Sequence, residues 1–207
     1  MSSSPSSSST SSSAASSSSS VRAFFAVELP DDLAEPIADL QSSLADAPGI
    51  RPTDPSQAHL TLKFLGDVAA ADLDGVRAAG ERAVDRAGVE PFDCTVKGLG
   101  VFPSLEYVSV VWAGIGRGSE ELTDLHEALE AETTALGFEP EEHAFTPHVT
   151  LARMDDGREK DLVREVVRER DPELGRFEVE EVRLIESTLT ESGPVYDPIE
   201  TFALGSR

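Results

Sequence analysis

Two four-residue segments, far apart in the chain, carry histidine and threonine at the same spacing: His59-Leu60-Thr61-Leu62 and His148-Val149-Thr150-Leu151. The residue types of each segment are typical of a β-strand. Because successive strand side chains point to opposite faces, the histidine and threonine of each segment share one face, and the leucine and valine side chains share the other. This pattern favours an apolar back that packs on helices and a polar front that lines a cleft.

Two imidazoles on such a front suit acid–base chemistry at phosphorus. The ordinary pKa of histidine is about 6.5, so one ring can accept a proton while the other donates one. An in-line displacement needs a base at the attacking oxygen and an acid at the leaving oxygen. The Thr61 and Thr150 hydroxyls can donate hydrogen bonds to the non-bridging oxygens as charge builds there. We expect no metal and no other cofactor, because neither segment has a second histidine or a carboxylate on its own face.

The composition is that of a protein with its own hydrophobic core. The chain has 207 residues, of which 39% are hydrophobic, enough for one large domain or two small lobes. Its single cysteine, Cys94, excludes an internal disulfide and a multi-cysteine zinc site. A reducing compartment is compatible with this, so we expect a cytoplasmic protein. Cys94 alternates with Phe92 and Val96 and is therefore expected to be a buried apolar residue rather than a nucleophile.

The charge is strongly acidic, with a formal net charge of −22 and a sequence pI near 4.4. One interpretation is salt adaptation, in a halophilic protein whose carboxylates hold water where salt screens their repulsion. The alternative is an ordinary acidic protein, which would melt no earlier in low salt than in molar salt. Either way, the charge disfavours binding along a nucleic-acid backbone, which depends on many Lys and Arg contacts. Any RNA substrate is expected to be held at its end.

The first twenty residues are almost all serine and are expected to be a disordered tail, because they lack apolar side chains to offset chain entropy. Residues 21–207 are expected to form one bilobal domain. The basic and apolar stretches of a secretory signal do not precede Val21, and nothing resembles a transmembrane span. We therefore expect no membrane association, and a monomer.

Periodicity and turn signals predict strands and helices in alternation after Val21. Besides the two histidine segments, the expected strands are 22–29, 92–99, 107–113, 177–189 and 196–204. The expected helices run from about 33 to 44, 70 to 87, 120 to 136 and about 157 to 170, with a loop at 48–55 and a turn region at 98–104. This order nearly repeats itself, so the two halves of the sequence suggest two lobes related by a rough two-fold. An unrelated α+β topology is the alternative.

With these features together, the chain resembles the two-histidine phosphoesterases and, among them, the RNA 2′,3′-cyclic phosphodiesterases, historically called 2′-5′ RNA ligases. The resemblance spans about Val21 to Leu204. It rests on the first strand (22–27), the two histidine segments with their flanks (59–66 and 145–153), and the segments 98–103 and 136–138. It implies an α+β, bilobal fold with two antiparallel sheets facing a central cleft, helices packed outside and a pseudo-two-fold.

The resemblance further implies hydrolysis of a 2′,3′-cyclic phosphate at an RNA 3′ end or on a nucleotide, leaving a 2′-phosphomonoester. By analogy, His148 is the proton acceptor and His59 the proton donor. Two alternatives stay open. The same chemistry can act on another substrate, such as a 2′-5′-linked oligonucleotide or another cyclic nucleotide, or in reverse as a 2′-5′ ligase. A non-catalytic RNA-end-binding protein is the third hypothesis, disfavoured by the intact proton-transfer pair.

Three further residues are candidates for substrate binding. Lys63 shares the alternation of His59 and can attract phosphate from the rim of the cleft, or be a solvated lysine. Tyr196 can stack on a base of the substrate, or be an amphipathic strand residue. The resemblance implies that Arg153 approaches the phosphate, although strict alternation from His148 turns it away. A bulge or strand end would have to bring it back.

The remaining candidates receive structural interpretations. His126 is expected at the surface or boundary of its helix, and His143 is expected to be solvated in an acidic loop. Trp112 is expected in the core. Phe24 and Phe25 are neighbours on opposite faces of their strand, so one is expected in the core and the other in the cleft.

Overall fold

Strand pairing is antiparallel throughout the part of the chain that the computed structural model describes, residues 20–47, 49–155, 160–191 and 193–205. The strands are β1 (Ser20–Glu28), β2 (Ile50–Pro52), β3 (His59–Ala69), β4 (Phe92–Ser104), β5 (Tyr107–Ile115), β6 (His148–Met154), β7 (Glu173–Val179), β8 (Glu181–Thr190) and β9 (Gly193–Ala203). The helices are α1 (Ala34–Ser42), α2 (Leu73–Ala87), α3 (Ser119–Ala135) and α4 (Lys160–Glu169), with short 3-10 turns η1 (Asp31–Leu33), η2 (Pro55–Gln57) and η3 (Ala70–Asp72).

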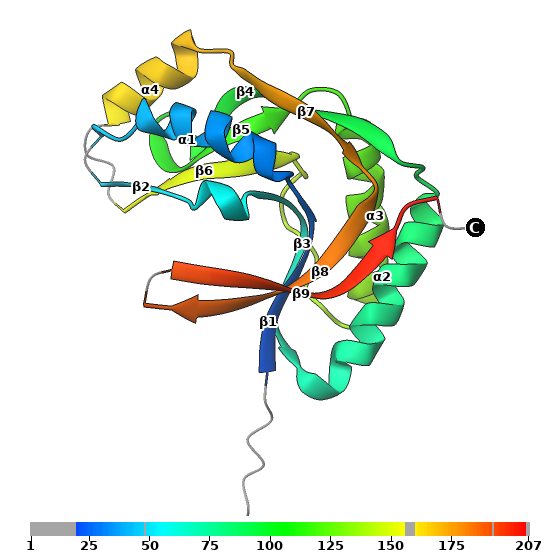
Figure 1. Cartoon of the computed structure of the whole chain (residues 1–207). Coiled ribbons are helices and arrows are strands. Elements are labelled where there is room, and N and C mark those ends of the chain that lie inside the picture. The colour runs from blue at the N-terminus through cyan, green and yellow to red at the C-terminus, as the bar shows by residue number, and fades with distance from the viewer. Residues whose placement is uncertain (1–19, 48, 156–159, 192, 206–207) are drawn as a thin grey trace, which may run out of the picture.

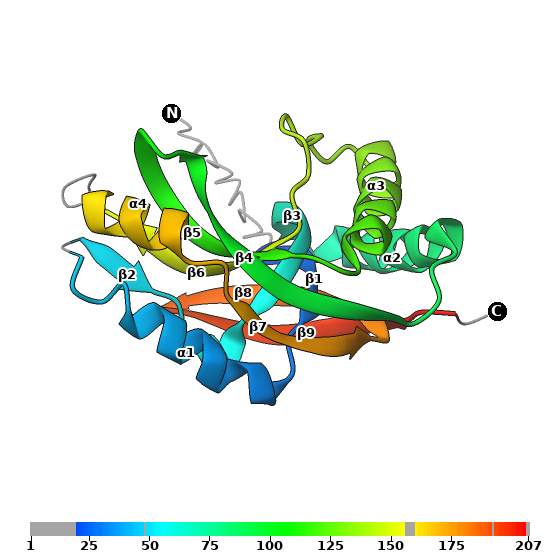
Figure 2. The ribbon, with the colours of Figure 1, turned by 90° about the horizontal axis from the view of Figure 1, so that it is seen from above.

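The sheet consists of two halves that meet at the two histidine strands. Its order is β7-β4-β5-β6-β3-β1-β8-β9, with β2 also paired to β6. Between the halves, β3 and β6 are paired at one position, Leu60 opposite Val149. The sheet curls around this junction (Figures 1 and 2). The predicted α+β fold with two antiparallel sheets around a cleft is confirmed, and here the two sheets are continuous through the motif strands.

Each half of the sheet carries a pair of helices on its outer side. The helices α2 and α3 pack together beneath β3, β8 and β9, whereas α1 and α4 contact β6, β7 and β4 (Figure 1). The leucine stripe expected on α3 is buried: Leu122, Leu125 and Leu129 are fully covered. Apolar burial of this kind is the main source of stability for an amphipathic helix. The backs of both histidine strands belong to the same core, which fixes the face that they turn to the cleft.

The chain crosses repeatedly between the two halves of the sheet. After β1 it forms α1 and β2 beside β6, returns for β3 and α2, crosses again for β4 and β5, and ends with β8 and β9 next to β1 (Figure 1). The two halves of the sequence therefore do not form one lobe each, as the near-repeat suggested. Antiparallel neighbours distant in sequence build each lobe, so the order of elements along the chain does not reveal it.

Three local predictions differ from the structure. The loop expected at 48–55 contains the strand β2, which pairs with β6, and the start of η2. The region 98–104 is not a turn but the second half of β4, and the turn lies at Leu105 and Glu106. Pairing of β4 with β7 ends at Lys97, so beyond it β4 is an edge strand in the described part of the chain, where Pro103 is tolerated. The single strand expected at 177–189 is two strands, β7 and β8, in different halves of the sheet.

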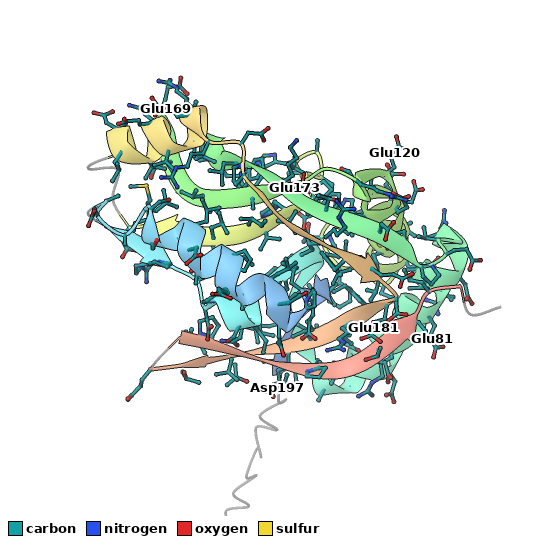
Figure 3. The ribbon with its side chains drawn as sticks, turned by 45° about the horizontal axis from the view of Figure 1, so that its top comes forward. Glu81, Glu120, Glu169, Glu173, Glu181 and Asp197 are labelled. Atoms are coloured by element: carbon teal, nitrogen blue, oxygen red, sulfur yellow. The ribbon has the colours of Figure 1, made fainter. Side chains whose placement is uncertain are left out.

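Carboxylates are spread over the outer surface of both halves. The six labelled in Figure 3 come from α2, α3, α4, β7, β8 and β9. No helix in the described ranges is both long and apolar enough to span a membrane. The serine-rich tail expected for residues 1–20 lies outside the described residues, apart from Ser20 at the start of β1.

Candidate active site

The two histidine-threonine pairs lie side by side where β3 meets β6. The pairing of Leu60 with Val149 sets the local register, so that His59 stands opposite Thr150 and Thr61 opposite His148. Leu60 and Val149 are buried, and the four polar residues are half-buried on the other face. Diagonal neighbours across an antiparallel pair stand roughly 7–8 Å apart. The two imidazoles therefore leave the sheet as diagonal neighbours on one face.

Both imidazoles are anchored in the same way, each through its Nδ1. The His59 Nδ1 lies 2.9 Å from the carbonyl oxygen of Gln57, and the His148 Nδ1 lies 2.7 Å from that of Thr146. A carbonyl oxygen accepts only, so each Nδ1 must carry the proton that it donates. The hydrogen bond thereby fixes the tautomer and leaves both Nε2 atoms for proton transfer.

The surroundings lower the pKa of both histidines. For His59 the largest cause is burial, partly offset by the hydrogen bond to Gln57, and the charges of His148 and Arg153 lower its pKa further. For His148 the causes are again burial, then the opposing hydrogen bond to Thr146, then Arg153. Burial disfavours the charged imidazolium because it removes water. The neutral form of both rings is thus favoured at pH 7, and the Arg153 charge lowers the pKa of each.

A bulge follows the threonine in both motif strands. The register against β1 shifts by one residue at Leu62, and the register against β5 shifts at Leu151. A bulge reverses the alternation beyond it. As a result Arg153 points into the cleft, as the resemblance implied, whereas Lys63 points away from it.

Lys63 is in fact buried behind the motif, with 1% of its surface exposed. Its Nζ donates to the Glu139 carbonyl oxygen at 2.8 Å and pairs with the Glu130 carboxylate at 2.8 Å. The prediction that Lys63 lies at the cleft rim is therefore wrong. Its neighbour His126 is also buried rather than at the surface: its Nδ1 lies 2.7 Å from the Leu62 carbonyl oxygen, and its ring stacks on Phe145.

Aromatic rings surround His59 on the β1–β9 side. Phe24 and Tyr196 lie with ring centroids 5.0 and 4.9 Å from the imidazole. Phe25 packs against Phe202 in the core, and Phe24 lies on the opposite face of β1 against His59, as predicted, but it is buried and does not line the cavity. Burial raises the pKa of Tyr196. These rings exclude water from one side of His59.

A second pair of rings surrounds His148. Phe102 and Trp112 lie with centroids 5.0 and 5.9 Å from its imidazole. Trp112 is thus half-buried beside the site rather than in the core as expected. Its indole lies against the backbone of Gly100, its partner across β4 and β5, where a Cβ atom would overlap the ring. The absence of a side chain at Gly100 therefore lets the Trp112 indole pack beside His148.

A cavity of about 620 Å³ opens in front of His59, Thr61 and Thr150, whereas His148 is not among its lining residues. Its walls are the β2–η2–β3 segment, β6 and the hairpin end of β9. The lining residues are Arg51, Pro52, Thr53, Asp54, Gln57, Ala58, His59, Thr61, Thr150, Arg153, Gly193, Pro194, Val195 and Tyr196. This volume is within the range of small-molecule sites. Tyr196 and Arg153 both line the cavity, as the sequence suggested, and Arg51 is a lining residue that no sequence pattern indicated.

The other titratable candidates lie outside the cavity. His143 is exposed, as expected, and Cys94 is fully buried, with its pKa raised by burial to about 12. In the described ranges, no three His, Cys, Asp or Glu side chains cluster in a way that would hold a metal ion.

Solved structures with this fold have related sequences. A Thermus thermophilus protein, TT0787, matches with a TM-score of 0.73 and 30% identity, over 90% of this chain and all of that one. E. coli LigT, solved in complex with 3′-AMP, matches with a TM-score of 0.74 and 25% identity, over 91% of this chain and all of that one.

Sequence comparison agrees. An RNA 2′,3′-cyclic phosphodiesterase of Methanothermobacter thermautotrophicus is 36% identical over 186 residues, 89% of this chain and 99% of the relative. One from Aeropyrum pernix is 40% identical over 142 residues, 67% of this chain and 77% of the relative. The family model described as "2'-5' RNA ligase superfamily" matches residues 29–191. This chain therefore belongs to the 2′-5′ RNA ligase superfamily, the two-histidine phosphoesterases, as the resemblance predicted.

Proposed function

We propose that this protein is an RNA 2′,3′-cyclic phosphodiesterase that opens the cyclic phosphate at an RNA 3′ end to a 2′-phosphomonoester. The observation that carries the proposal is the pair of imidazoles on diagonal positions of β3 and β6, each held through Nδ1 with Nε2 left for the substrate. Curated relatives of that name, 30 to 40% identical to this chain, support the assignment.

In the proposed step, water attacks phosphorus in line with the bond to the ribose O3′. His148 Nε2 takes a proton from the water as the new P–O bond forms. His59 gives its proton to O3′ as the P–O3′ bond breaks. The product keeps its phosphate on O2′, and the two histidines have exchanged protonation states, which solvent restores. Each proton transfer contributes about 10²–10⁴-fold to the rate.

The other cleft residues stabilise charge on the phosphate. Thr61 and Thr150 donate hydrogen bonds to the non-bridging oxygens in this proposal, which their register opposite the two histidines supports. Arg153 supplies a guanidinium close to both rings. In the free protein, burial disfavours the imidazolium. An anionic phosphate bound between the rings favours it. Substrate binding thus helps to keep His59 protonated for its role as the acid.

Product analysis tests the proposal. The protein is incubated, with a chelator present, with adenosine 2′,3′-cyclic phosphate and with an RNA that ends in a cyclic phosphate, and phosphorus resonances are followed. The 2′-monoester is expected from both substrates. The 3′-monoester would overturn the choice of leaving oxygen, and a rate that falls with chelator would contradict a metal-independent step. Absence of product alongside measurable binding would favour an RNA-end-binding protein.

A further inference from the structure

Arg51 of β2 and Arg153 of β6 are direct neighbours across an antiparallel strand pair. They are partners in the register, between the pairs Ile50–Met154 and Pro52–Ala152. Ala152 and Met154 are buried on the other face, so Arg153 is turned to the cleft, and both arginines line its cavity. The Cβ atoms of directly opposed residues stand about 4.5–5.5 Å apart. Two guanidinium-bearing side chains therefore leave the sheet together at one wall of the site.

Like charges directly opposite each other destabilise a strand pair. The cost stands out in a chain with 39 acidic and 17 basic residues, where a carboxylate partner is easily supplied. Arg153 nevertheless makes no ion pair with any residue that the structure describes. Arg51 pairs with Asp155, and both of these side chains are more than half exposed. Exposed pairs contribute at most about 1 kcal/mol, so a phosphate can displace this carboxylate.

The two arginines differ in their electrostatic effect on the histidines. Arg153 lowers the pKa of both His59 and His148, while Arg51 is not among the charges that shift either one. Arg51 lies on β2, which is paired with β6, and lines the same cavity as His59 and Arg153. Tyr196, also a lining residue, belongs to the hairpin of β8 and β9, which extends to the same side of the molecule as β2 (Figure 1). One cavity therefore brings His59, Arg153 and Arg51 together.

We propose that Arg51, next to Arg153, forms a subsite for the phosphate on the 5′ side of the terminal nucleotide of the substrate. The inference rests on the proposed function and names the substrate class of the same site: RNA ends, whose last nucleotide carries a 5′ phosphodiester, rather than bare nucleoside cyclic phosphates. The 5′ phosphate and the 2′,3′-cyclic phosphate of the terminal nucleotide are joined through one ribose, so the two phosphates come within reach of two adjacent arginines. The guanidinium fork also suits bidentate contacts with phosphate oxygens.

Three substrates at one salt concentration test the subsite: adenosine 2′,3′-cyclic phosphate, the same compound with a 5′ phosphate, and the dinucleotide ApA with a cyclic phosphate end. Removing one charged hydrogen-bonding partner typically costs the equivalent of about 10- to 100-fold. We expect the two substrates with a 5′ phosphoryl group to have kcat/KM higher than the first by about that factor. In Arg51→Gln this advantage is lost through KM, while kcat/KM for adenosine 2′,3′-cyclic phosphate stays within about twofold of the native protein.

Two further variants control for general effects of charge. Arg117→Gln removes an equally exposed arginine that is paired with Asp93 at 3.0 Å and lies outside the cavity, so all three kcat/KM values are expected to hold. Asp155→Asn removes the carboxylate that competes for Arg51, so the advantage of the dinucleotide is expected to increase. Thermal melting of each variant shows whether the fold is retained.

The subsite is overturned if Arg51→Gln lowers kcat/KM equally for all three substrates, or if the dinucleotide advantage survives the substitution. If the native protein hydrolysed none of the three substrates, the proposed function would be refuted, but the subsite would not. That case is decided by calorimetric binding of ApA with a 2′ phosphate and of adenosine 2′-monophosphate. A loss of affinity in Arg51→Gln for the dinucleotide alone upholds the subsite, and an equal or absent loss for both ligands refutes it.

Discussion

The two motif strands start alike and then diverge. In β3 and β6 the histidine, the threonine, the Nδ1 anchor two residues upstream and the bulge after the threonine all correspond. Beyond the bulge, β3 continues with a buried Lys63 and an exposed Phe64, whereas β6 continues with a buried Ala152 and an exposed Arg153. Phe64 is 47% exposed and has the Arg22 guanidinium 5.8 Å from its ring centre.

The two strands therefore share the histidine, the threonine, the Nδ1 anchor and the bulge, and they differ in the residues that follow the bulge. The matched strands place a pair of equivalent imidazoles around one point. The Arg153 guanidinium on β6 has no counterpart on β3, so among the described residues that line the cavity the basic side chains come from β2 and β6. Lys63 on β3 has no counterpart on β6, and it pairs with Glu130 in the interior instead. In the proposed reaction, the charge of the phosphate is therefore neutralised from the β6 side of the cleft.

Substitution of the matched histidines has the largest expected effect. His59→Ala and His148→Ala should each lower kcat by about 10²–10⁴-fold, because each removes one proton transfer. His143→Ala is the matched control: His143 is exposed in a loop, so the rate should stay unchanged. Initial rates on adenosine 2′,3′-cyclic phosphate measure the effect. A variant of either motif histidine that keeps more than a tenth of the native rate would contradict the assignment.

Substitution of Lys63, which has no counterpart on β6, should lower the free energy of unfolding. Lys63→Met leaves the Glu130 carboxylate and the Glu139 carbonyl without their partner, at an expected cost of about 3 kcal/mol. The value is at the lower end for broken buried pairs because Glu130 is partly exposed. Urea unfolding measures the loss. Lys97→Met, at an exposed lysine paired with Asp171, should change the free energy of unfolding by less than about 1 kcal/mol. Equal losses in both variants would refute the structural role of Lys63.

Substitution of Arg153 and Phe64, the exposed residues at corresponding positions of β6 and β3, tests the asymmetry of the cleft. Arg153→Gln should lower kcat/KM by about 10- to 100-fold, because a charged partner of the phosphate is lost. Phe64→Leu, at the corresponding position of β3, should stay within about twofold. Steady-state kinetics on one cyclic nucleotide compares the two variants directly. Comparable losses would mean that both sides of the cleft bind the phosphate.

The four motif residues could be predicted from sequence because strand alternation holds between His59 and Thr61 and between His148 and Thr150. It fails one residue later, where the bulges turn Lys63 into the core and Arg153 into the cleft, and no residue type in either segment signals a bulge. Arg51 was missed because it is placed by the pairing of β2 with β6, across about a hundred residues. Gly100 suggested a turn, but its role is to admit the indole of Trp112.

The pH dependence is the smallest effect and follows from the lowered pKa of both histidines. The free protein must hold one ring neutral and the other charged, and both pKa values lie below the ordinary 6.5. The maximum of kcat/KM is therefore expected below pH 6.5, falling on both sides. Arg153→Gln removes a charge that lowers both pKa values, so its profile should move to higher pH. A native maximum above pH 7 would contradict these directions.

A substrate that needs no acid tests the division of labour between the two imidazoles most directly. In adenosine 2′,3′-cyclic phosphate with sulfur in place of the bridging O3′, the leaving thiolate departs without protonation. The defect of His59→Ala should then shrink to within about tenfold of the native rate, while that of His148→Ala should remain at about 10²–10⁴-fold. If His148→Ala were rescued instead, the roles would be reversed. If neither defect changed, the pair would not act as acid and base across one phosphate.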